Sequence, residues 1–185
     1  MAMKKAVIIS IRPKWCQMIA SGEKTIEVRK NRPKLDTPFK CYIYCTRDKH
    51  LAFMQNQTGT NLIACMDVET AIPVGGSVGN GKIIGEFICD RISLIAYDGG
   101  ELSSTTNAAF SPATCLSQTE IIAYIGDKGR CYGWHINGLR IYDTPRELGE
   151  FTGLRDTRFG AEPYDIKRPP QSWCYVDGGK EGWAV

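Results

Sequence analysis

The stretch SIRPKWCQMIASGEKTIEVRK (residues 10–30) passes from the end of one predicted strand through a short helix into a second strand. The first strand is the β-branched run KAVIISIR at 5–12. Pro13 suits the first position of the helix, because its missing N–H has no intrahelical partner there. Gly22 predicts the end of the helix as a left-handed cap. The stretch therefore predicts strand, helix and strand in close succession.

The second strand carries three charges close together. Alternation places Glu27 and Arg29 on one face of the strand and Ile26 and Val28 on the other. Lys24 lies just before the strand and can reach the charged face. The residue pattern leaves two interpretations open. An exposed ion pair would contribute about 0–1 kcal/mol, whereas a polar pocket would let Lys24 donate to a base or a phosphate, or transfer a proton.

The rest of the chain predicts short strands with a few helices and no strand–helix alternation. Strands are predicted at 39–47, 82–97 (one long strand or a bent pair), 130–143 and 169–176, capped helices at 117–126 and 144–151, and a charged loop at 152–168. Insertions are expected near 48–81, with one short helix or strand, and near 98–116. The fold class is α+β: a small mixed β-barrel of about six strands with peripheral helices. We expect residues 1–185 to form a single domain.

One apparent nucleotide motif is rejected. GSVGNGK (76–82) has the spacing of a phosphate-binding loop, but Ile83 follows where Ser or Thr would hold magnesium. The next residues predict a strand, so no helix N-terminus meets a phosphate. Asn80 and Gly81 instead form a typical hairpin turn. We expect no nucleotide triphosphate as a ligand.

Charge and cysteine content narrow the class of protein. Residues 1–50 hold twelve Lys/Arg and four Asp/Glu, whereas residues 51–185 hold eleven and sixteen, so the basic N-terminal third indicates an anionic partner. The eight cysteines are expected to be reduced thiols in a cytoplasmic protein, because several lie in apolar runs and no signal-peptide core or membrane-spanning run is visible. His50 and His135 have no cysteines at zinc spacing, so no metal or other cofactor is expected.

The segment 10–30 strongly resembles the start of the ASCH family, whose signature is G-x-K-x-x-E-x-R. Gly22, Lys24, Glu27 and Arg29 match all four positions. The blocks GKIIGEFICDRI (81–92), YGWHINGLRIYDTPREL (132–148) and PQSWCYV (170–176) extend the resemblance over nearly the whole chain. The resemblance implies a PUA-like β-barrel with a cleft near the signature, in a family associated with RNA binding.

Some relatives of this family are small amidohydrolases that remove the acetyl group from N4-acetylcytidine. The resemblance implies a lysine, a threonine and a glutamate as their catalytic residues. Lys24 matches the lysine, but Glu27 stands at the threonine position. The glutamate would precede the helix at 117–126, and SPATCL (111–116) has no carboxylate, while Glu120 belongs to a predicted capping box.

Basic and aromatic residues complete the predicted site. The cations flanking the signature are predicted to contact phosphates; they are Arg12, Lys14, Lys30, Arg32 and Lys34. Trp15 is expected mostly in the core, on one helix face with Met18 and Ile19. Trp134 and His135 point to opposite sides of their strand, and His135 is the better candidate for the cleft, although most lone histidines have a structural role.

Three functions follow from these residues. The first is binding of RNA or a modified nucleoside in a cleft lined by Lys24, Glu27 and Arg29, where Glu27 accepts from an exocyclic amine. The second is a small amidohydrolase for N4-acylated cytidine, with Lys24 and Glu27 as the acid/base pair. The third is a protein-interaction adaptor with a vestigial cleft. A basic groove leading from the cleft favours the first, a closed pocket with buried Lys24 the second, and a cleft plugged by 98–116 the third.

Overall fold

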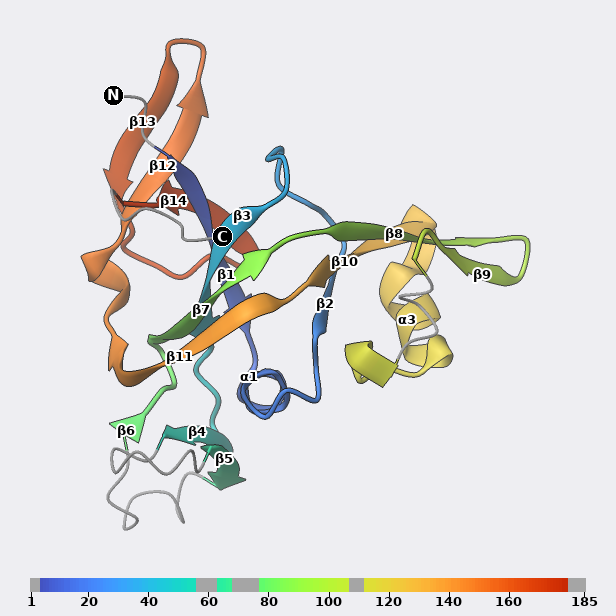
Figure 1. The fold of residues 1–185 in the computed structure, drawn as a ribbon, viewed down its shortest axis with the longest axis horizontal. Coiled ribbons are helices and arrows are strands. Elements are labelled where there is room, and N and C mark those ends of the chain that lie inside the picture. The colour runs from blue at the N-terminus through green and yellow to red at the C-terminus, as the bar shows by residue number, and fades with distance from the viewer. Residues whose placement is uncertain (1–3, 56–62, 68–76, 107–111, 180–185) are drawn as a thin grey trace.

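The computed structural model describes residues 4–55, 63–67, 77–106 and 112–179. Within them the chain forms a mixed α+β fold, mostly strands, with two α-helices and three β-sheets (Figure 1).

The largest sheet has seven strands in the order β11-β7-β3-β1-β14-β12-β13. Their bounds are β1 Lys5–Ile11, β3 Phe39–Cys45, β7 Ile83–Cys89, β11 Asn137–Arg146, β12 Thr152–Thr157, β13 Gly160–Asp165 and β14 Trp173–Asp177. The central strand β1 is parallel to β3 and antiparallel to β14. Its alternate residues enter two cores: Val7 and Ile9 pack on one face, Ala6 and Ile8 on the other. Burial on both faces explains why this strand is apolar throughout.

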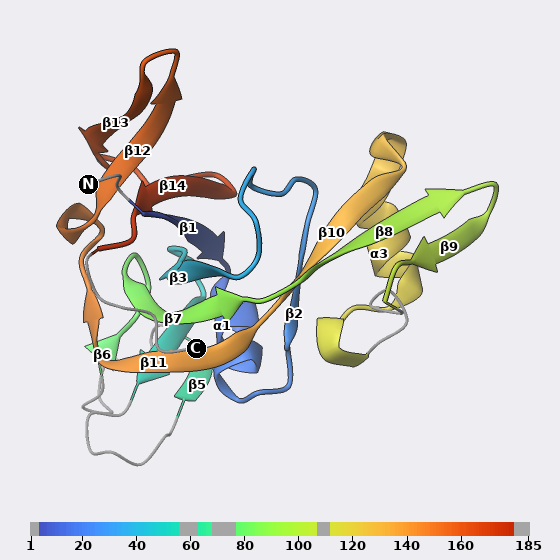
Figure 2. The same ribbon diagram turned by 45° about the horizontal axis from the view of Figure 1, so that its top comes forward.

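A four-stranded sheet in the order β2-β10-β8-β9 lies to one side of the first (Figures 1 and 2). It contains β2 (Ile26–Arg29), β8 (Ile92–Asp98), β9 (Glu101–Ser104) and β10 (Arg130–His135), and helix α3 (Gln118–Ile125) packs on it. Ile121 and Ile125 of α3 share a core with Ile26 and Val28. The predicted alternation of β2 is therefore confirmed.

The third sheet joins β4 (Leu51–Gln55), β5 (Ile63–Asp67) and β6 (Ser77–Val78) in the order β5-β4-β6. Helix α1 (Pro13–Ala20) contacts β3, β4 and β5. Pro13 begins this helix and Gly22 follows it with φ +82°, as predicted.

A two-stranded ribbon joins the two larger sheets (Figure 2). β7 runs into β8 through residues 90–91, and β10 runs into β11 through Ile136. β7 pairs with β11 in the seven-stranded sheet, whereas β8 pairs with β10 in the four-stranded sheet. The predicted bent pair at 82–97 is thus confirmed, and the two halves of each long strand serve different sheets.

Several sequence predictions are corrected. The described strands form open sheets, not a closed barrel of about six strands, because the ribbon carries the chain away from the first sheet before a barrel can close. Residues 152–168 are mostly the hairpin β12–β13 rather than a loop. Residues 144–151 form the end of β11 and a short 3₁₀ helix, Leu148–Glu150, instead of an α-helix.

The two expected insertions are partly described. Residues 48–81 include β4, β5 and β6, while 56–62 and 68–76 lie outside the described residues. Residues 98–116 include β9 and the 3₁₀ helix Pro112–Thr114, while 107–111 lie outside. A further 3₁₀ helix, Gly126–Lys128, follows α3. Asn80 and Gly81 form the predicted turn before β7, and Asn80 binds the β4 backbone at Leu51 and Phe53.

Three observations bear on the class of protein. No helix in the described part of the chain is long and apolar enough to cross a membrane. The seven cysteines whose side chains are described are all free thiols, as expected. Among the residues that the structure describes, no group of three His, Cys, Asp or Glu side chains is placed to hold a metal ion.

Candidate nucleotide-binding cleft

A cleft of about 440 Å³ opens where the seven-stranded and four-stranded sheets meet α1 and α3. The lining residues are Ser10, Ile11, Arg12, Trp15, Lys24, Glu27, Val28, Arg29, Thr46, Leu116, Glu120, Tyr124 and Gln171. They come from segments far apart in the chain, and the ASCH-like signature supplies the charged group at the centre of this set. The volume falls within the range of about 300–1,000 Å³ typical of small-molecule sites.

Lys24 is the most enclosed charged residue of the cleft, with 2% of its surface exposed. Its Nζ donates to the carbonyl oxygen of Thr114 at 2.5 Å and lies 3.4 Å from Oε2 of Glu27. The same ammonium lies 5.0 Å from the centre of the Trp15 ring. A buried ammonium needs such partners, because an uncompensated charge is costly away from water.

Glu27 holds a cation on each side. Oε1 accepts from Nη2 of Arg29 at 2.9 Å, while Oε2 faces Lys24. Nη2 of Arg29 also donates to the carbonyl oxygen of Ser10 at 2.6 Å, which ties β2 to β1. The side chains of Glu27 and Arg29 are only 8% and 11% exposed. The surface ion pair that the sequence left open is therefore a buried network of two cations and one carboxylate.

Arg29 also has a donor to spare. Its Nε is buried and has no hydrogen-bond partner in the structure. A buried polar group without a partner carries a free-energy cost that a correctly placed acceptor would relieve. Nε itself is closed off from the cleft, so it binds an acceptor there only after the Arg29 side chain shifts.

Two aromatic residues line the cleft with the charged network. Trp15 of α1 is half-buried, and Nζ of Lys14 lies 5.0 Å from its ring centre. Tyr124 of α3 is 36% exposed, with Nζ of Lys30 at 5.2 Å from its ring centre. Burial raises the pKa of Tyr124, so the phenol stays protonated at neutral pH. Trp15 was expected mostly in the core; it is partly buried and packs against the core cluster of Cys16 and Ile19, while it also lines the cleft.

Glu120 lines the cleft but is engaged in the helix cap, as predicted. Its carboxylate accepts from the backbone N–H of Ser117 at 2.8 Å, and the Ser117 hydroxyl accepts from the Glu120 backbone N–H. Hydrogen bonds from Ser117, above all from its backbone, hold the pKa of Glu120 below its usual value. Glu120 is therefore a charged residue of the rim.

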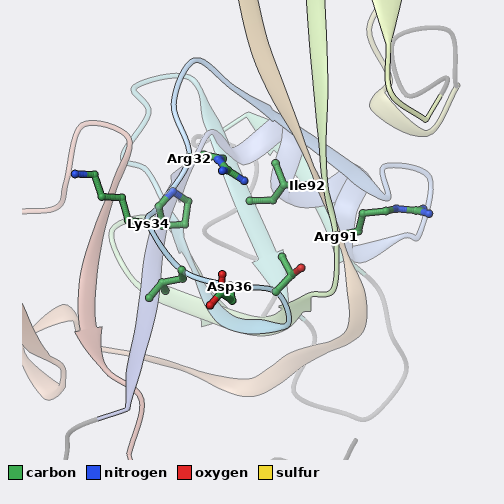
Figure 3. Close-up of a pocket in the computed structure, with 8 residues that line it drawn as sticks. Arg32, Lys34, Asp36, Arg91 and Ile92 are labelled. Atoms are coloured by element: carbon green, nitrogen blue, oxygen red, sulfur yellow. The ribbon is translucent and has the colours of Figure 1, made fainter.

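Arg32 and Lys34 lie in a separate hollow of about 490 Å³ in the loop between β2 and β3. Asp36, Arg91 and Ile92 also line this loop hollow (Figure 3). In Figure 3 the Lys34 and Arg91 side chains extend outward in opposite directions. The five predicted phosphate-binding cations therefore lie in different places. Arg12 lines the cleft, and Lys14 and Lys30 lie over its aromatic residues. Arg32 and Lys34 lie in the loop hollow.

His135 is placed outside the cleft, contrary to the expectation from sequence. Nδ1 lies 3.1 Å from Nη2 of Arg91, and Nε2 lies 2.7 Å from Oγ of Ser93. A guanidinium only donates, so Nδ1 accepts and Nε2 carries the proton. Burial, and secondarily the charge of Arg91, lower the pKa of His135. The strand alternation was predicted correctly, but His135 lies on the sheet face where its ring contacts Ser93 of the neighbouring strand β8.

The sequence identified the charged group but missed much of its surroundings. Ser10, Thr46, Tyr124 and Gln171 line the cleft and were not proposed. The only signal for Ser10 was a hydroxyl at the end of an otherwise apolar strand. Nothing in the sequence near Gln171 or Tyr124 indicates that they lie beside the signature, because strand order and helix placement bring them there.

The fold and the cleft together define a mixed α+β protein with a polar site between two sheets. The model of the ASCH domain matches residues 9–84, a range that contains the whole signature. The resemblance to the ASCH family that the motif predicted is therefore confirmed over residues 9–84. None of the curated proteins matches the chain significantly.

Solved ASCH structures from Zymomonas mobilis resemble the chain over most of its length. The crystal structure titled ASCH is 18% identical, covers 92% of this chain and 86% of its own, and has a TM-score of 0.48. A serine-to-alanine mutant of the Zymomonas mobilis protein is 18% identical, covers 95% of this chain and 90% of its own, and has a TM-score of 0.50. This likeness concerns the fold alone.

Proposed function

We propose that this protein binds RNA, or a modified nucleoside, by placing one base in the cleft beside Lys24, Glu27 and Arg29. One observation supports the proposal most directly: the largely buried charged residues Lys24, Glu27 and Arg29 line the same cleft as two aromatic residues. Single-stranded RNA is typically bound by stacking bases on aromatic side chains and by hydrogen bonds to their edges. The cleft contains both kinds of group.

Each group has a specific role in this proposal. The base stacks on Trp15 or Tyr124. Glu27 accepts from an exocyclic amine with the lone pairs that its two cations leave free.

Phosphates are neutralised by the exposed cations around the cleft. Arg12 lines it directly, and Lys14 and Lys30 lie over its aromatic rings. We keep Arg32 and Lys34 as proposed phosphate contacts for nucleotides outside the cleft. His135 no longer belongs to the proposed site, because its ring nitrogens already bind Ser93 and Arg91.

The test is fluorescence anisotropy with short single-stranded RNAs of different base composition. We expect Trp15→Leu to weaken binding about 10-fold or more, since stacking contributes about 1–3 kcal/mol per base. Phe159→Leu is the matched control, because Phe159 is 80% exposed on the β12–β13 hairpin. Equal binding by both variants would contradict the proposed role of the cleft.

A second candidate function, hydrolysis of N4-acylated cytidine, is favoured by the enclosure of Lys24 beside Glu27. Water would attack the acyl carbon, the bond from carbon to N4 would break, and cytidine and a carboxylic acid would be released. Thr114, from the segment where the resemblance implies a glutamate, contacts Lys24 through its backbone carbonyl and not through a carboxylate. Hydrolysis would therefore depend on Glu27 to orient the water.

Chromatography of N4-acetylcytidine incubated with the protein tests this second function. Release of cytidine by the wild type and its loss in Lys24→Met would establish it. An unchanged substrate peak, together with RNA binding, would leave the binding function alone. A cleft filled by 98–116 would have favoured the adaptor hypothesis; among the described residues of that segment, Leu116 lines the cleft.

A further inference from the structure

A second hollow of about 630 Å³ lies next to the cleft. Ser10, Thr46 and Gln171 line both spaces at the end of β1, and we call the two spaces together the groove. The wall at this junction is fixed. The Ser10 hydroxyl donates to the carbonyl oxygen of Pro170 at 2.6 Å. The Ser10 backbone N–H donates to the carbonyl oxygen of Ser172 at 2.9 Å.

The far part of the groove is cationic. Arg47 and Lys167 line it, and both are exposed. Neither forms an ion pair within the described ranges of the chain. The acidic residue of this lining, Glu147, is bound by Lys82 at 2.9 Å. Two cations therefore remain for an external anion.

The far part also has apolar lining residues. Tyr44 and Ile166 are largely buried, and Leu148 and Pro169 complete this apolar part of the lining. Apolar side chains beside two cations fit the face of a sugar or base with a phosphate next to it. Gln171, at the junction, offers both donors and acceptors to the edges of a base.

We propose that this far part is a second nucleotide subsite, in which Arg47 and Lys167 bind a phosphate adjacent to the nucleotide in the cleft. The inference rests on the proposed RNA binding and extends it. It makes the ligand a single-stranded oligonucleotide of at least two nucleotides, since a free nucleoside would fill only the cleft.

The test compares Arg47→Ala/Lys167→Ala with the wild type, using a fluorescein-labelled pentanucleotide RNA over a series of salt concentrations. Each phosphate contact to a single strand contributes about 0.7 to the slope of log K against log salt, so the double variant should reduce the slope by about 1.4. Its affinity should fall about 10-fold at moderate salt. Arg155→Ala/Arg158→Ala, on the β12–β13 hairpin, makes the same change in net charge and should leave the slope unchanged.

The variants separate the failure of this inference from the failure of the proposed function. If the wild type binds no RNA, both are overturned. If Trp15→Leu weakens binding while Arg47→Ala/Lys167→Ala behaves like the hairpin control, the cleft stands and the second subsite is overturned. If only Arg47→Ala/Lys167→Ala loses affinity and slope, these cations bind RNA without a nucleotide in the cleft, and both the role of the cleft and the second subsite as proposed are overturned. If a mononucleoside displaces the labelled RNA equally well from Arg47→Ala/Lys167→Ala and from the wild type, the cleft of the variant is intact.

Discussion

The cleft and the loop hollow use the same residue types in opposite ways. In the cleft, Lys24 and Arg29 are buried and share the carboxylate of Glu27. In the loop hollow, Arg32, Lys34 and Asp36 are exposed. Only a few residues separate the two groups in sequence, so the difference arises from β2, which turns its alternate residues inward, and from the loop that follows it. Proximity to a signature is therefore a weak guide to membership of a site.

The largest expected effect concerns stability. Glu27→Gln should lower the free energy of unfolding by about 3 kcal/mol, because it leaves two buried cations without a counter-charge. Asp36→Asn makes the same chemical change in the loop hollow and should stay within about 0.5 kcal/mol of the wild type. Urea denaturation monitored by tryptophan fluorescence measures both. Equal effects of the two substitutions would remove the contrast between the regions.

An intermediate effect concerns RNA affinity. Arg32→Ala/Lys34→Ala should reduce the salt slope of single-stranded RNA binding by about 1.4, as should Arg12→Ala/Lys30→Ala beside the cleft. The two pairs carry the same charge, so anisotropy titrations compare their positions directly. If the Arg32→Ala/Lys34→Ala variant keeps the wild-type salt slope, the RNA does not contact the loop hollow.

The smallest expected effect concerns pH. The pKa of His135 is lowered in the folded protein, so below the usual histidine value of about 6.5 the unfolded chain binds more protons than the folded one. His135 should therefore reduce stability as pH falls from 6.5 toward its folded pKa. His135→Gln should remove this part of the pH dependence, measured by urea denaturation at pH 7.5 and 5.5.

His50→Gln makes the same substitution at an exposed position. An equally large pH-dependent difference in that variant would show that the packing of His135 against Ser93 and Arg91 is not the cause. The comparison therefore tests whether the hydrogen bonds of His135 to Ser93 and Arg91 cause the pH dependence of stability.

The sequence predicted the fold best where local signals and burial agree. The strand–helix–strand passage of residues 5–30 and the capping box of α3 have such signals, and both are observed. The hairpin β12–β13 was missed because most of its residues are exposed on both faces, so it lacks the alternation that marks a half-buried strand. The closed barrel was wrong because no local signal reveals that one long strand leaves a sheet and joins another.

The site was predicted to a similar extent. The signature supplied Lys24, Glu27 and Arg29, and strand alternation placed the last two on one face. The core contact of Trp15 was predicted, but its second role, as a cleft residue beside two ammonium groups, was not. Tyr124 and Gln171 depend on the packing of α3 and on the strand order around β1, which are not properties of their own neighbourhoods in sequence.

The ribbon between the sheets has a mechanical consequence for the cleft. Ser10 belongs to the seven-stranded sheet, whereas Tyr124 belongs to α3, which packs on the four-stranded sheet. The two bends, at residues 90–91 and at Ile136, therefore set the angle between the two walls of the cleft. A substitution that changes either bend would alter the width of the cleft without touching any residue that lines it.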